Sequence, residues 1–90
     1  MRTAREAIKA IVTSLKDLPR PYDEAKVMEI LTAEVTNAPV PFYAYCKFKG
    51  VKNALEEARA TPEMIQAVLR AVQVYNGPGS EYLSTIPLSK

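Results

Sequence analysis

The chain has 90 residues, a formal net charge of +2 and an apolar content of 48%. This length predicts a single domain covering residues 1–90, and the composition excludes an intrinsically disordered protein. The longest apolar runs are far below the ~18 residues that a membrane-spanning helix needs. The charged start MRTAREAIKA does not resemble a secretory signal. We therefore expect a cytoplasmic protein that has no membrane partner.

Histidine is absent from the sequence, and cysteine occurs once, as Cys46. Without histidine, Ser–His–Asp catalysis, Cys–His catalysis and histidine-containing zinc sites are excluded. A single cysteine excludes an internal disulfide and indicates a reducing compartment. No glycine-rich phosphate-binding motif occurs. We therefore expect a protein that is not an enzyme, with no catalytic residue, no metal site and no cofactor.

The first two predicted elements are amphipathic helices. The sequence TARE, from Thr3 to Glu6, is a capping box that begins the first helix, and Pro19 ends it. Asp23, or Tyr22 just before it, begins the second helix, which Asn37 closes. The expected buried stripes are Ile8, Ile11, Val12, Leu15 and Leu18 in the first helix and Val27, Ile30, Leu31 and Val35 in the second.

The stretch VPFYAYCKFKG, from Val40 to Gly50, holds most of the aromatic side chains and admits two interpretations. Its alternating pattern fits a strand over Val40–Phe48, paired with the C-terminal sequence SEYLSTIPL. A helix fits equally, with Asn37 as N-cap, prolines in the first turn and Gly50 as the stop. We favour the helix because an isolated strand would leave its backbone groups unpaired. Its expected core side chains are Phe42, Tyr45, Cys46 and Phe48, with the lysines at the rim.

The rest of the chain predicts two more helices and a tail. The first spans Val51 to Ala60, and the second begins after the cap Thr61 and reaches Tyr75. Residues 80–90 form a tail that packs back on the body or forms a short strand. The predicted fold class is all-α, a bundle of four to five helices, with the strand at Val40–Phe48 as the alternative.

The segment ALEEARATPEMIQAVL, from Ala54 to Leu69, resembles the helix-turn-helix of bacterial and phage repressors. Thr61 and Pro62 match the turn and the start of its second helix, and the buried positions are matched by Ile65, Val68 and Leu69. The sequence departs from the pattern at Arg59, where glycine is usual, and at Leu55, where alanine is usual. A second register, from Cys46 to Val51, would place Glu56 at a buried position.

The resemblance implies a DNA-binding regulator whose recognition helix is Thr61–Tyr75. Glutamine and arginine side chains can read adenine and guanine edges, and cations contact phosphates. The base-contacting residues would be Glu63, Gln66 and Arg70, and the phosphate-contacting residues would be Lys47, Lys49, Lys52 and Arg59. The alternative interpretation is that the first three form the solvated face of an ordinary helix. Under this first hypothesis, the binding partner of the protein is duplex DNA.

Two further hypotheses concern the aromatic residues and the bundle. Tyr43, Tyr45 and Phe48, with the nearby lysines, could stack on single-stranded nucleic acid, although we favour core packing. The helix order, with a proline-started third helix and the capping sequence TPEM, is similar to that of bacteriocin immunity proteins. That likeness, or a phage-type inhibitor of a host protein, implies a bundle that binds a single protein partner. Its apolar patch would contain Tyr43, Tyr82 and Leu83.

A homodimer is a further expectation from the uneven charge distribution. The segment Asp23–Glu34 holds four carboxylates and one lysine, whereas Asn37–Leu55 holds three lysines and no carboxylate. The two segments could meet across a two-fold axis.

Overall fold

The computed structural model describes residues 3–77 and 79–88, within which six helices form: α1 Ala4–Lys16, α2 Glu24–Asn37, α3 Pro39–Lys49, α4 Val51–Glu57, α5 Pro62–Val74 and α6 Ser80–Leu83. These described residues contain no strand, which confirms the all-α prediction. The strand alternative for Val40–Phe48 is wrong, because this stretch lies within α3. The helix number exceeds the predicted four to five because the tail contains the short helix α6.

Local capping interactions set the starts of three helices. The Thr3 hydroxyl accepts a hydrogen bond from the backbone N–H of Glu6 at 3.1 Å, and the Glu6 carboxylate accepts one from the N–H of Thr3 at 2.8 Å. This is the predicted capping box. Asp23 and Thr61 cap α2 and α5 through their side chains, as predicted. These starts depend on residues three or fewer positions apart, and the sequence therefore predicts them directly.

The start of α3 differs from its prediction. Asn37 is not its N-cap but the last residue of α2, and Ala38 lies between the two helices. The backbone N–H of Ala38 bonds to the carbonyl of Glu34 at 3.1 Å, so Asn37 closes α2 as predicted and is not free to start α3. Gly50 ends α3 as predicted, with a φ of +76° that favours glycine.

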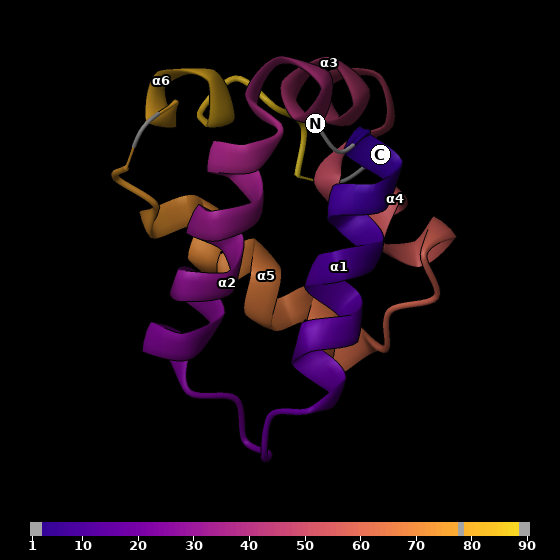
Figure 1. The fold of residues 1–90 in the computed structure, drawn as a ribbon, viewed down its shortest axis with the longest axis vertical. Helices are drawn as coiled ribbons and strands as arrows, with labels where there is room; N and C mark the ends of the chain where they lie inside the picture. The colour runs from indigo at the N-terminus through magenta and orange to yellow at the C-terminus, as the bar shows by residue number, and fades with distance from the viewer. Residues whose placement is uncertain (1–2, 78, 89–90) are drawn as a thin grey trace.

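The helices form two layers with α3 across one end (Figure 1). α1 and α2 lie side by side and antiparallel in front, and α5 crosses behind them in this view. α4 lies beside α1, and α6 lies next to the end where α2 leads into α3. None of the helices in the described ranges is both long and apolar enough to cross a bilayer.

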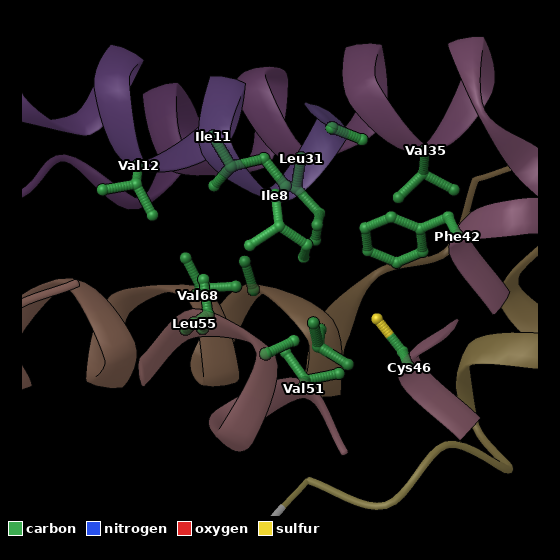
Figure 2. Close-up of a cluster of buried hydrophobic side chains, with 14 of the residues drawn as sticks. Ile8, Ile11, Val12, Leu31, Val35, Phe42, Cys46, Val51, Leu55 and Val68 are labelled. Atoms are coloured by element: carbon green, nitrogen blue, oxygen red, sulfur yellow. The ribbon is translucent and has the colours of Figure 1, made fainter. Parts of the chain in front are cut away.

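The hydrophobic core lies between these layers, and α3 closes it at one end (Figure 2). Phe42 and Cys46, one turn apart on α3, are both fully buried. Tyr45 is half-buried, as part of the same predicted core face. The prediction that Phe48 belongs to the core is wrong, because its side chain is 92% exposed. The core predictions for the stripes of α1 and α2 are confirmed, although Ile30 is only half-buried. The first helix ends at Lys16, before the predicted stop at Pro19, so the half-buried Leu18 lies beyond α1.

The segment after α6 returns to the body of the protein. Leu83 and Ile86 are buried, and the backbone N–H of Val51 donates to the carbonyl of Pro87 at 2.9 Å. The prediction that the tail packs back is therefore confirmed for residues 80–88, and the short-strand alternative is wrong there. Residues 89–90 of the predicted tail lie outside the described residues.

Candidate functional site

An open groove of about 610 Å³ lies between α3, the end of α2 and the segment Gly79–Ile86. We call it the α3–α6 groove. Its floor and walls are mainly apolar: Val35, Val40, Tyr43, Ala44, Tyr82 and Ile86. Lys47 from α3 and Glu81 from α6 also line it.

The spacing of α3 explains why this helix forms both core and groove. Phe42 and Cys46 lie one turn apart and face the core. Val40, Ala44 and Lys47 follow one another at intervals of four and three residues, and they share a different face that lines the groove. α3 therefore has two apolar sides, and only one of them is covered.

A tyrosine pair holds α6 against α3. The rings of Tyr43 and Tyr82 stack with centroids 5.0 Å apart and an interplanar angle of 18°. Gly79, with a φ of +81°, allows α6 to lie close to α3, because a Cβ at this position would overlap the Tyr43 hydroxyl. Burial raises the pKa of Tyr43, and the nearby charge of Glu81 raises it further. The groove wall is therefore built by contacts between segments that lie far apart in the sequence.

The edge of the α3–α6 groove exposes large apolar side chains. Val40 is 72% exposed and Tyr82 is 56% exposed. The predicted patch of Tyr43, Tyr82 and Leu83 is confirmed only in part: the two tyrosines line the groove, but Leu83 is buried in the core. The sequence analysis missed Val40, although its spacing to Ala44 and Lys47 places the three residues on one side of a helix.

The predicted base-contacting residues border a second groove, of about 470 Å³, between α2 and α5. Glu63, Gln66 and Arg70 are exposed and lie on one side of α5, which brings them together as predicted from helical spacing. The Glu63 carboxylate accepts a hydrogen bond from the Arg20 guanidinium at 3.1 Å, and Glu24 lines the same groove. This side of α5 therefore carries both signs of charge.

Two of the predicted phosphate-contacting residues, Lys47 and Lys49, face different neighbours. The Lys49 ammonium lies 2.8 Å from the Glu57 carboxylate, which raises the pKa of Lys49 and lowers that of Glu57. The Tyr45 hydroxyl donates to the same carboxylate at 2.6 Å. Lys47 instead lines the α3–α6 groove, so two lysines two residues apart serve different faces of α3. Lys52 is exposed on α4.

The turn between α4 and α5 has a specific backbone conformation. Arg59 has a φ of +65°, in the left-handed region where glycine is usual. The backbone N–H of Ala60 donates to the carbonyl of Leu55 at 3.0 Å, which closes the end of α4. Leu55 is fully buried, whereas Glu56 is exposed. The second register of the helix-turn-helix pattern, which needs Glu56 buried, is therefore wrong.

The two charged segments proposed for a homodimer do not each form one face. Glu24 borders the groove between α2 and α5, whereas Glu34 lies at a shallow depression against α1. Lys47 and Lys49 likewise face different neighbours, so each charged segment is divided between two faces of the molecule.

Comparison with known proteins identifies no relative: no family model, no curated protein and no solved structure matches this chain. Among the described residues, no three side chains of the kind that bind metals come together. The choice between functions therefore depends on the geometry of the two grooves and of the turn at Arg59.

Proposed function

We propose that this chain is a protein-interaction bundle that binds an apolar segment of a protein partner in the α3–α6 groove. The observation that carries this proposal is the open apolar groove edged by the exposed side chains Val40 and Tyr82. The exposed part of a large apolar side chain is stabilised when a partner removes it from water.

The composition of the groove supports a protein as the occupant. Tyrosine is enriched among the residues that contribute most to protein–protein binding, because its ring offers both apolar area and a polar hydroxyl. The groove presents two tyrosines, Tyr43 and Tyr82, in a stacked pair. Lys47 and Glu81 lie among the apolar residues, as polar groups that can fix the orientation of a partner.

Changing Val40 to aspartate should weaken partner binding without unfolding the protein. Val40 is exposed, so the folded chain tolerates the change, but a bound partner would bury an unpaired carboxylate. We expect the captured amount of partner to fall at least about tenfold. The measurement is capture from an extract of the source cells by the immobilised chain, quantified by mass spectrometry.

The matched control is Val74→Asp, which places the same charge at a valine of similar exposure, 68%, beside the other groove. We expect this variant to capture the same proteins as the wild type. Equal capture by all three chains, or capture lost only in Val74→Asp, would contradict binding in the α3–α6 groove.

Duplex DNA binding is the second candidate, and the conformation of Arg59 favours it. The positive φ occurs at the turn position that is usually glycine in the helix-turn-helix, and α5 starts at the predicted cap Thr61. Gln66 and Arg70 are exposed on α5, where they can reach base edges. The ion pairs Lys49–Glu57 and Arg20–Glu63 weaken this candidate, since the first engages an expected phosphate contact and the second engages an expected base contact within the chain.

A titration of random duplex DNA by fluorescence anisotropy tests this candidate. If Lys52 and Arg59 contact phosphates, the slope of log K against log salt should be about −1.8, at about −0.9 per contact. The double variant Gln66→Ala, Arg70→Ala should lose any sequence preference, whereas Lys9→Ala, an exposed lysine on α1, should behave as the wild type. No binding at low salt would rule this candidate out.

A further inference from the structure

We propose that the occupant of the α3–α6 groove is a second copy of this chain. Two copies would associate across a two-fold axis, with the groove of each facing the groove of the other. This inference rests on the proposed function, because it names the partner of the same groove.

The groove and the side chains that fit it lie on one surface. The hollow is lined by Val35, Ala44 and Ile86, and its edge carries Val40 and Tyr82, which are both largely exposed. In a two-fold dimer the same patch occurs on both sides of the interface, so each copy supplies both the hollow and the projecting groups. A surface with both features on one patch is suited to self-association.

The two charges of the groove are complementary under the same symmetry. Lys47 lies on the α3 side and Glu81 on the α6 side. Neither takes part in an ion pair within residues 3–77 and 79–88. A two-fold axis that runs along the groove exchanges its α3 and α6 sides, so we infer that Lys47 of each copy faces Glu81 of the other and forms two equivalent ion pairs at the rim of an apolar contact. One positive and one negative group per copy leave the interface electrically neutral.

Charge reversal tests this pairing by sedimentation velocity over a wide range of protein concentration. We expect the wild type to form a dimer at increasing concentration. Lys47→Glu and Glu81→Lys should each weaken the dimer at least about tenfold, because like charges then face each other at both contacts. The double variant Lys47→Glu, Glu81→Lys should restore the dimer to within about threefold of the wild type, since it exchanges the two partners of each pair.

Matched controls separate the pairing from a change in net charge. Lys52→Glu and Glu29→Lys change the net charge by the same amounts at exposed positions outside the groove, and they should dimerise as the wild type does. Circular dichroism of every variant tests whether the helical fold is kept. All the exchanged side chains are exposed, so the monomer should remain folded.

The outcomes separate this inference from the proposed function. A wild type that stays monomeric at every concentration, or a dimer that both single reversals leave intact, would overturn the inference. So would single reversals that weaken the dimer without rescue by the double variant. In any of these cases, Val40-dependent capture of a different protein would still uphold the proposed function. If the dimer responds to the charge reversals as expected but is unaffected by Val40→Asp, the claim that Val40 lies in the dimer interface is contradicted.

Discussion

Replacing Phe42 with alanine should lower the free energy of unfolding by about 3–5 kcal/mol. The Phe42 side chain is fully buried, and it points into the core on the same side of α3 as Cys46 (Figure 2). The change removes this apolar contact and leaves a cavity that the neighbouring helices can fill only in part. Because small domains have total stabilities of about 5–15 kcal/mol, the variant should be close to unfolding at room temperature. Urea denaturation followed by circular dichroism measures the loss.

Phe48→Ala provides a control of the same chemistry on the same helix. Phe48 is 92% exposed, so its removal should change the free energy of unfolding by no more than about 0.5 kcal/mol. The contrast between two phenylalanines six residues apart tests which side of α3 faces the core. Equal losses in the two variants, or a larger loss for Phe48→Ala, would show that α3 is rotated from the orientation described above.

The Cys46 thiol should react with iodoacetamide about 1000-fold more slowly in the folded protein than in the urea-unfolded chain at about pH 8. Burial raises the pKa of Cys46 to about 12, and the thiolate is the reactive form. An unfolded thiol has a pKa of about 8.5, so a substantial part of it is ionised under the same conditions. Mass spectrometry of samples quenched over time gives both rates. Rapid labelling of chains that circular dichroism shows to be folded would contradict the buried position.

Because of the same pKa shift, the free energy of unfolding should decrease as the pH rises. The folded state holds the thiol proton more tightly, so this contribution is fully present below about pH 8.5 and is lost as pH rises toward 12. At about pH 10 the wild type should have lost about 2 kcal/mol relative to a Cys46→Ala variant, which lacks the titrating group. The comparison cancels the titration of lysines, which both proteins share. A stability difference between the two proteins that is constant from neutral pH to pH 10 would contradict the shift.

Much of the fold could be predicted because its helix boundaries depend on near neighbours. The capping box at Thr3 and the caps at Asp23 and Thr61 involve residues no more than three positions away. The end of α3 at Gly50 follows from a backbone conformation that disfavours side chains. The prediction of Asn37 as the N-cap of α3 was wrong for a related reason. Residues 37–38 could belong to either helix, and the hydrogen bond from the Ala38 N–H to the Glu34 carbonyl keeps Asn37 in α2.

Less of the candidate site could be predicted, because it combines segments distant in sequence. The DNA-contact residues on α5 share one side, as helical spacing requires, but the ion pair of Lys49 with Glu57 joins two different helices. Similarly, Glu81 lines the groove beside residues of α3 because tertiary contacts, including the stack of Tyr43 on Tyr82, hold α6 against α3. α6 has four residues and is too short to be stable by itself, so tertiary contacts must stabilise it.

The sequence by itself determined the helical class, the starts of the capped helices and the buried stripes of α1 and α2, because these depend on local hydrogen bonds and on one apolar face per helix. Only the tertiary structure decided that the second apolar side of α3 stays uncovered. Periodicity groups Phe42 with Cys46, which the sequence predicted to be buried, and Val40 with Ala44, but it does not show whether another segment covers the second group. The packing of α1, α2 and α4 buries the first group and leaves the second group as the wall of an open groove.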